Sequence, residues 1–557
     1  MIPNGPTGNI CQSDIDPNNV GVYGAGGKSI CATTSLDFDE SSQSYKQYAA
    51  EAHIDSDFDG MFNFLIGANY LRGDTTNNSY YVNSFGLDYA SGILGAAAAL
   101  SGATGGRAVF RPSPFFRSNT LRGRLDSYGI FGESYFQFND KVKLTLGLRY
   151  NHDKKSTTAR TTLLSDGLSS EFAGGNAILA LVGANSIEDA LNYATADFDK
   201  GTLGVQPFQE RSVTFGRMTG RAVLDYQITP DNLVYLSYSR GYKSGGINPP
   251  LSVGSVNDSF KPESVDAFEV GSKNRFGALQ LNLSAFYYRY KDLQLSRITS
   301  RTSVNDNIDA NIYGVEAEAI MAPTRNLLVN LSASYLKTKV VGDQFFIDTR
   351  DVSAGRSDTV IVKDITLASH CAVTGASAAG ANAFVNAVNA GVGLRPTTPI
   401  PGTNTTGAFS ICGVLAQQAA NIGNLFGGIR VSSGIEKNVK GNQLPQAPEF
   451  KWSAGVQYTL ETGEMSLVPR FDINYTGESY GTIFNGNINR IKGYAVMNAQ
   501  IQLNGQDDRW FVRGFIQNIA NNNATTGLYV TDQSSGLFTN IFTLDPRRYG
   551  VAAGFRF

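Results

Sequence analysis

Apolar and polar side chains alternate strictly along several stretches of this chain, each about 10 to 14 residues long. The clearest stretches are residues 141–151, 450–460, 465–475 and 548–557. In the first of them, Leu144, Leu146 and Leu148 fall on one side, and charged or small residues fall on the other. Successive side chains of a strand point to opposite faces, and a tilted strand of this length crosses a bilayer. The alternation therefore predicts membrane-spanning β-strands with one face toward lipid and the other toward water.

Fifteen such stretches follow one another along the sequence, and aromatic residues gather at the ends of the apolar stripes. The stretches begin near residues 43, 61, 127, 141, 214, 232, 262, 278, 309, 326, 449, 464, 490, 509 and 547. Tight turns alternate with long segments, which include residues 72–126, 152–212 and 341–448. Outer-membrane barrels have short periplasmic turns and longer extracellular loops. We therefore expect an all-β, transmembrane antiparallel β-barrel over residues 43–557, preceded by an extracellular loop over residues 1–42.

The segment 341–448 is long enough to contain further structure. One additional barrel hairpin is expected there, formed by stretches near residues 359–367 and 427–437. The alanine-rich residues 376–390 predict a helix within this loop.

Composition argues against several other classes of protein. Basic and acidic residues number 46 and 48, so the chain lacks the basic excess that a nucleic-acid partner requires. Four cysteines without a CxxC pair do not support a zinc fold. The apolar runs are far shorter than the roughly 18 residues of a membrane-spanning helix. A soluble β-sandwich is the alternative all-β fold, but it would use shorter strands without this alternation of loop lengths.

The odd number of strands has a consequence for closure. Antiparallel closure of a single-chain bacterial barrel needs an even number of strands, and an unpaired edge inside lipid is costly. An additional hairpin would not change this parity. From the sequence we expect the chain to be a fragment that lacks an odd number of preceding strands.

Several segments resemble the barrel of TonB-dependent outer-membrane receptors. They are residues 235–246 (YLSYSRGYKSGG), 260–273 (FKPESVDAFEVGSK), 312–318 (IYGVEAE), 444–458 (LPQAPEFKWSAGVQY), 493–503 (GYAVMNAQIQL), 515–521 (FIQNIAN) and 545–557 (DPRRYGVAAGFRF). The resemblance spans residues 43–557 in the same order. It is specific to the family and not to a substrate. The terminal aromatic Phe557 resembles the signal by which the barrel-assembly machinery recognises its clients.

This resemblance implies a 22-stranded barrel filled by an N-terminal plug. Such receptors import scarce ligands such as ferric siderophores, vitamins or glycans across the bacterial outer membrane, and TonB transmits the energy. Nothing before residue 43 resembles the plug or the TonB box. Fifteen strands leave about seven of the roughly 22 absent, and seventeen strands, with the additional hairpin, leave about five absent. The chain alone is therefore expected not to be competent for transport. A passive porin, or an adhesion or assembly barrel, is the alternative.

Cysteine and histidine positions suggest disulfides rather than a metal site. Cys11 with Cys31, and Cys371 with Cys412, each fall within one predicted external loop, on the oxidising side of the membrane. Two loop disulfides are therefore expected. A metal site at His370 is the alternative to a disulfide at the neighbouring cysteine, but the other histidines lie far away in the sequence. Residues 24–29 (GAGGKS) miss the phosphate-loop spacing because Val22 stands where glycine is required.

The sequence does not support an enzyme or a resident cofactor, since nucleophile-elbow and HExxH motifs are missing. Charged residues on the polar side of the strands are expected to face the lumen, where they solvate it, pair with a plug or guide an anionic ligand. They are Arg149, Arg217, Arg221, Asp225, Glu269, Lys273, Arg470 and Asp472. Ligand contacts are expected from aromatic residues of the long external loops. The candidates are Tyr80, Tyr81, Tyr89, Phe115 and Phe116.

Overall fold

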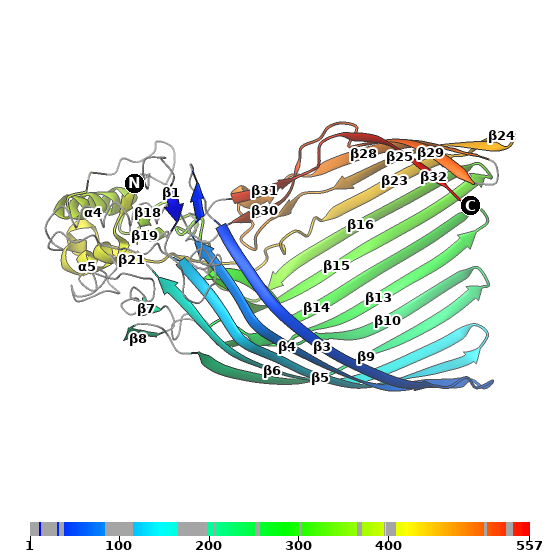
Figure 1. Ribbon diagram of the computed structural model, residues 1–557, viewed down its shortest axis with the longest axis horizontal. Coiled ribbons are helices and arrows are strands. Elements are labelled where there is room, and N and C mark those ends of the chain that lie inside the picture. Colours follow the sequence, from blue (N-terminus) through cyan, green and yellow to red (C-terminus); the bar gives the residue numbers. More distant parts are fainter. Residues whose placement is uncertain are drawn as a thin grey trace.

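The computed structural model describes most of the chain. The described residues are 10–12, 30–32, 38–83, 115–164, 195–196, 199–203, 208–250, 257–299, 302–364, 370–394, 396, 408–505, 509–530 and 539–556. Within them, one large antiparallel sheet dominates the structure (Figure 1).

Fifteen strands of this sheet pair in the order in which they occur in the sequence. They are β3 (Phe38–Asp55), β4 (Phe62–Asn83), β5 (Phe115–Asn139), β6 (Val142–Leu164), β9 (Gln209–Thr229), β10 (Asn232–Lys243), β13 (Glu263–Phe276), β14 (Leu279–Thr299), β15 (Thr302–Thr324), β16 (Leu327–Val341), β23 (Phe450–Tyr458), β25 (Met465–Thr476), β28 (Tyr494–Asn504), β29 (Trp510–Gln517) and β32 (Arg548–Phe555). The short β24 (Leu460–Thr462) pairs only with β25. The predicted succession of fifteen antiparallel strands is thus confirmed.

The first strands of the sheet are longer than the alternation predicts. β4, β5 and β6 contain 22, 25 and 23 residues, so β5 extends over roughly 80 Å at about 3.3 Å per residue. Only part of that length is needed to cross a bilayer. The loops expected at residues 72–126 and 152–212 are therefore wrong at their borders, because the strands continue into them. The hydrogen-bonded ladder continues because backbone pairing does not require apolar side chains.

The pairing register divides the sheet into two faces. The apolar face carries Leu146, Leu148 and Ile130, and these side chains are exposed in the isolated chain. The polar face carries Arg149, Gly147 and Glu133 on the same strands. An exposed apolar face of this extent requires a nonaqueous environment or a partner.

Aromatic residues form two rows on the apolar face. The row nearer the long connections includes Tyr70, Tyr128, Tyr150, Tyr287, Tyr313, Tyr335 and Phe450, and the row nearer the short turns includes Phe62, Tyr226, Phe276, Tyr458 and Phe555. Amphipathic rings prefer the headgroup level of a bilayer. The two rows are therefore placed where the two interfaces of a membrane would lie.

A small α/β unit is inserted between β16 and β23. Its four-stranded sheet has the order β20 (Phe409–Ser410), β18 (Thr359–Asp364), β19 (His370–Thr374) and β21 (Arg430–Ser432), and it packs against α4 (Ala378–Gly391), α5 (Cys412–Ile422) and the 3-10 helix η3 (Gly423–Phe426). The hairpin expected near residues 359–367 and 427–437 is therefore wrong as a barrel hairpin. These segments pair within the unit because their side chains are buried against the two helices. The helix predicted over residues 376–390 is confirmed as α4, whose first turn is capped by Ser377.

Short strand pairs lie outside the large sheet and the small unit, before β3 or in the connections between the long strands. They are β1 (Ile10–Gln12) with β2 (Ile30–Ala32), β7 (Thr195–Ala196) with β8 (Asp199–Leu203), β11 (Gly246–Ile247) with β12 (Ser259–Phe260), β17 (Phe345–Ile347) with β22 (Glu436–Asn438), β26 (Ser479–Tyr480) with β27 (Arg490–Ile491), and β30 (Thr525–Val530) with β31 (Thr539–Thr543). The 3-10 helix η4 (Asn487–Asn489) precedes β27.

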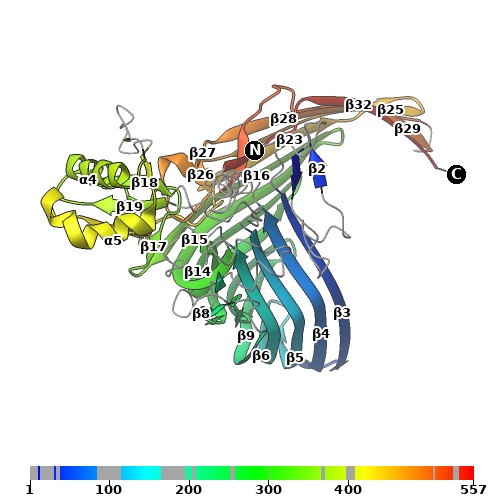
Figure 2. The ribbon, with the colours of Figure 1, turned by 60° about the vertical axis from the view of Figure 1, so that its left-hand side comes forward.

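The sheet is curved, with β3 and β32 at its two edges (Figure 2). The small unit and the strand pairs lie at one end of the long strands, and the tight turns lie at the other (Figure 1). Among the described helices, none has both the length and the apolar character that a bilayer span requires.

Candidate functional site

The polar face of the sheet collects the charged residues that the sequence singled out. In antiparallel strands, residues directly opposite each other point to the same side. Following these pairs from β6 to β25 places all of them on one face: Arg149, Arg217, Arg221, Asp225, Glu269, Lys273, Arg470 and Asp472. Strands that are remote in the sequence thus contribute to one continuous charged surface.

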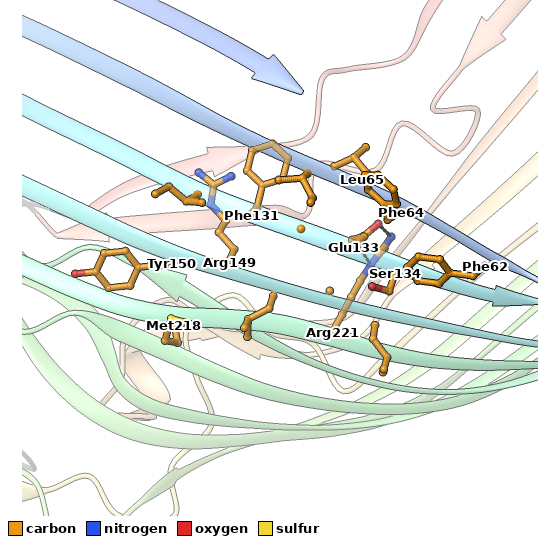
Figure 3. Close-up of a pocket in the computed structure, with 16 residues that line it drawn as sticks. Phe62, Phe64, Leu65, Phe131, Glu133, Ser134, Arg149, Tyr150, Met218 and Arg221 are labelled. Carbon is orange, nitrogen blue, oxygen red and sulfur yellow. Dashed lines mark hydrogen bonds and ion pairs between the residues drawn. The ribbon is translucent and has the colours of Figure 1, made fainter. Parts of the chain in front are cut away.

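Arg221 on β9 forms an ion pair with Glu133 on β5, although β6 lies between these strands. The Arg221 Nε to Glu133 Oε1 distance is 2.5 Å, and Tyr135 donates a further hydrogen bond to Glu133 at 2.7 Å. The side chains of Glu133 and Arg221 point toward each other in Figure 3. On the intervening β6, Gly147 lies opposite both residues, and a Cβ there would contact the Glu133 carboxylate and the Arg221 side chain. Glycine at this position therefore makes the bridge possible.

Two further side-chain hydrogen bonds pass over a glycine of the intervening strand in the same way. Arg149 on β6 donates to Asn69 on β4 at 2.7 Å, over Gly129 of β5. Arg470 on β25 donates to Asn330 on β16 at 3.1 Å, over Gly455 of β23. The recurring arrangement is a long cation, a small residue on the next strand and an acceptor on the strand after it. It ties alternate strands together on the polar face.

The other charged residues that the sequence predicted also lie on this face. Glu269 accepts hydrogen bonds from Tyr235 at 2.6 Å and Tyr288 at 3.4 Å. Arg470 also pairs with Asp472 at 2.6 Å. Arg217 donates to the carbonyl of Gly216. Across the described part of the chain, Asp225 and Lys273 form no ion pair, so they remain available on this face.

Sequence reasoning did not single out several partners on this face. Glu133, Asn69 and Asn330 accept the three bridging hydrogen bonds, and Asp153 accepts one from Tyr242 at 2.8 Å. These residues lie on the polar side of the same alternating stretches. Extending the period of two along each stretch would have placed them on the polar face, but not beside their partners.

A hollow of about 350 Å³ opens above the polar face, among the long connections. Phe346, Ile347 and Ile483 contribute apolar walls, while Arg350 and Thr482 contribute polar groups. The Arg350 Nη1 and Thr482 Oγ1 atoms are buried and find no hydrogen-bond partner within the part of the chain that the structure describes, so these two atoms do not themselves face the hollow.

Asp348 also lines this hollow. Burial raises the pKa of its carboxyl above the ordinary value. The guanidinium of Arg350 brings a positive charge to this hollow. The hollow therefore suits an anionic ligand with an apolar or planar part.

The predicted loop aromatics occupy strands where the structure describes them. Tyr80 and Tyr81 lie in β4, and Phe115 and Phe116 begin β5. Their expected position in loops is therefore wrong, because β4 and β5 continue to pair as far as Asn83 opposite Phe115. Tyr89, Phe557 and residues 24–29 lie outside the described residues.

One of the two predicted cysteine pairs is a disulfide among the described side chains. Cys371 and Cys412 form a disulfide that joins β19 to the start of α5. Cys11 and Cys31 occupy directly opposite positions of β1 and β2. Across the described ranges, no group of three or more histidine, cysteine or acidic side chains is arranged to hold a metal ion. His370 lies beside the disulfide, opposite Lys363.

Comparison with known proteins identifies the family. Residues 11–369 match the family described as TonB dependent receptor-like, beta-barrel. Because this match covers more than half of the chain, the chain belongs to that family, whose members are receptors and transporters of the bacterial outer membrane.

Solved structures of this kind have the same fold. The ferric yersiniabactin uptake receptor FyuA from Yersinia pestis matches with a TM-score of 0.55 at 14% identity, over 93% of this chain and 55% of that one. The siderophore receptor PiuA from Acinetobacter baumannii matches with 0.51 at 12%, over 92% and 56%. The closed form of the ferric-catecholate import receptor Fiu from K12 E. coli matches with 0.50 at 12%, over 99% and 59%. The chain thus spans little more than half the length of these proteins.

Proposed function

We propose that this chain forms the wall of an outer-membrane receptor that takes up a scarce iron complex of the siderophore type, energised through TonB. The observation that carries this proposal is the two-faced sheet of fifteen strands. Its apolar face bears two aromatic rows that fit a bilayer, while its opposite face is charged from β6 to β25. Membership of the family supports the role of TonB as partner and the outer membrane as the location.

The hollow among the long connections is the proposed ligand-entry site. Siderophore complexes present anionic oxygen atoms and planar or apolar parts, and a charge-assisted hydrogen bond from arginine suits such oxygens. Arg350 supplies a positive charge, Thr482 a polar side chain and Phe346 an apolar wall. The titles of the similar structures name ferric yersiniabactin and ferric-catecholate ligands, which supports iron complexes as the class to test first.

A binding experiment tests this site. The full chain in detergent micelles is titrated with ferric catecholate, hydroxamate and hydroxycarboxylate complexes, and binding is measured by calorimetry. We expect one class to bind, and we expect Arg350→Ala to weaken that binding by about 10- to 100-fold because a charged hydrogen bond is lost. The matched control is Arg356→Ala, which removes an exposed arginine paired with Asp358 and absent from the hollow lining.

Cellular uptake and conductance separate a receptor from a passive pore. Iron-55 uptake by a strain that expresses the whole receptor, with its plug, is expected to stop when TonB is deleted. Uptake that continues without TonB, together with a permanently open conductance in planar bilayers, would support a porin instead.

A further inference from the structure

The hollow around Arg350 has walls that are packed in place before any ligand arrives. Phe346, Ile483 and Phe484 line it, and they also pack in a hydrophobic cluster against β15 and β16. Ile308 of β15 is buried at the centre of this cluster. A pocket with a preformed lining loses little binding free energy to the ordering of its side chains.

Side-chain amides hold the segment that carries Ile483 and Phe484. The Asn442 amide donates to the carbonyl of Ile483 at 2.8 Å. Asn485 accepts from the backbone N–H of Gln443 at 2.6 Å and donates to the carbonyl of the same residue at 3.0 Å. Asn485 also has a positive φ of 50°, a conformation that asparagine tolerates better than most residues. This wall of the hollow is therefore tied to the connection that leads into β23.

Arg350 is the charged group of the hollow that keeps donors to spare. Within the part of the chain that the structure describes, its side chain forms no ion pair and no hydrogen bond. Among its guanidinium nitrogens, Nη1 is buried, while Nε and Nη2 stay accessible. Asp348 also lines the hollow, but its carboxylate accepts the backbone N–H of Arg350 at 3.0 Å. Asp351 and Lys437, the charged groups beside Asp348, have opposite signs. The free donors of Arg350 therefore fit one anionic group of a ligand.

The volume of the hollow limits the size of this ligand. An apolar cavity of about 150 Å³ binds one benzene molecule. The hollow has about 350 Å³, so it holds one ring with a few substituents or a fused pair of rings. Three bidentate arms wrapped around an iron ion need several times the space of one ring. A whole ferric complex therefore does not fit inside, although one of its arms does.

Aromatic and aliphatic side chains share the lining. Phe346 and Phe484 supply rings from two different connections, while Leu295 of β14 and Leu528 of β30 supply aliphatic surface. Rings prefer offset-stacked or edge-to-face contacts with other rings, which add about twofold to tenfold in affinity beyond the burial of apolar area. The lining therefore favours a flat aromatic ring over an aliphatic chain.

We propose that this hollow binds a free aromatic monocarboxylate, a single ring that carries one carboxylate, without iron. The carboxylate pairs with Arg350, and the ring lies against Phe346 and Phe484. This inference goes beyond the proposed function, because it requires neither iron nor TonB. A ferric complex with an aryl arm would compete for the same space, whereas an aliphatic hydroxycarboxylate would leave the apolar walls unfilled.

Equilibrium dialysis of the full chain in detergent micelles against radiolabelled benzoate tests the site, with empty micelles measured in parallel. Three competitors separate the features of the ligand. Cyclohexanecarboxylate keeps the charge without the flat ring, benzamide keeps the ring without the charge, and acetate keeps only the carboxylate. We expect cyclohexanecarboxylate to bind about twofold to tenfold more weakly than benzoate. We expect benzamide and acetate to bind at least about tenfold more weakly.

Variants identify the groups that bind benzoate. Arg350→Gln should weaken binding by about 10- to 100-fold, because a charge-assisted hydrogen bond is lost. Arg356→Gln is the matched control, since it changes an arginine of the same connection that pairs with Asp358 outside the lining. Phe346→Leu keeps an apolar wall, so it should reduce the preference for benzoate over cyclohexanecarboxylate and leave binding of the latter nearly unchanged. Heat-dependent migration in gels checks the folding of each variant.

The outcomes separate this inference from the proposed function. Equal binding of benzoate by Arg350→Gln and Arg356→Gln would overturn the site. Benzamide or cyclohexanecarboxylate that binds as tightly as benzoate would overturn it as well. Each preparation is also titrated with the ferric complexes. A chain that binds a ferric complex but not benzoate disproves the benzoate site alone, and a chain that binds benzoate but no ferric complex disproves the siderophore function alone.

Discussion

Among single residues, the polar face depends on contacts that pass over a strand. Arg221 and Glu133 meet because the residue between them, Gly147, has no side chain. Arg149 and Asn69 meet over Gly129 by the same means. An alanine at either glycine would compete for the space of the bridging groups. Small residues on this face thus decide which charges can pair.

The titration of His370 predicts how the stability of the inserted unit depends on pH. Burial, reinforced by the charge of nearby Lys363, lowers the pKa of this imidazole below its ordinary value of about 6.5. The folded unit favours the neutral ring, so the unfolded chain binds the extra proton more readily. The stabilisation is therefore complete above about pH 6.5 and decreases as the pH falls below it, toward the folded pKa.

Carbon-13 NMR of labelled histidines in detergent micelles measures this effect. The signal of His370 is assigned by its loss in His370→Gln, and its titration midpoint is expected below pH 6.5. Lys363→Met should raise the midpoint by removing a repulsive charge. A midpoint at or above about 6.5 in the wild-type chain would contradict the burial argument.

Among the elements of the fold, the inserted unit has a closed hydrophobic core of the kind found in soluble domains. Phe384 of α4 is fully buried and meets Phe426 edge to face, with ring centroids 5.8 Å apart. Leu415 of α5 and Val362 of β18 complete the same core. The apolar face of the barrel strands instead exposes large side chains such as Leu148 and Ile130. The two parts of the chain thus bury hydrophobic surface in different ways, one against itself and the other against lipid.

Phe384→Ala is expected to destabilise this unit by about 3–5 kcal/mol, because it leaves a cavity in a closed core. Cys371 is buried in the same core, so opening of the unit exposes the disulfide. The rate of its reduction under native conditions, followed by thiol trapping, should rise by about 10²- to 5 × 10³-fold. Leu425→Ala is the control, since Leu425 is 81% exposed on η3 and should leave the rate nearly unchanged. Equal rates in both variants would contradict this account of the core.

In the whole molecule, both tryptophans lie on the apolar face, near opposite ends of the strands. Trp452 lies in β23 near the long connections and stacks on Tyr475 with ring centroids 6.0 Å apart. Trp510 begins β29, just after a short connection, and lies opposite Phe555. Each indole is thus in an aromatic row, at one of the two proposed membrane interfaces.

Quenching by brominated lipids tests this placement. In bilayers, the variants Trp452→Phe and Trp510→Phe each retain one tryptophan. Both are expected to be quenched more by bromines near the headgroup than by bromines deep in the acyl chains. A tryptophan introduced by Ser237→Trp into a chain carrying both phenylalanine changes should be unaffected, because Ser237 lies opposite Glu269 on the polar face. Strong quenching at that position would contradict the assignment of the two faces.

Much of the barrel is accessible from the sequence alone. Strand starts such as Val142, Asn232 and Trp510 lie within a residue of the positions expected from the alternation. The charged residues share a face because a period of two is a local property of extended backbone. The resemblance to the family is likewise carried by short motifs in several of the strands.

Only the tertiary structure determined which residues distant in the sequence are in contact. Register and packing between remote segments decide three features of the structure. These are the ion pair of Arg221 with Glu133, the pairing of residues 359–364 in a separate sheet, and the hollow around Arg350. The same holds for the extension of β4 and β5 beyond the apolar band. Alternation specifies which way a side chain points, whereas hydrogen-bonded pairing and burial across the sheet decide which side chain it meets.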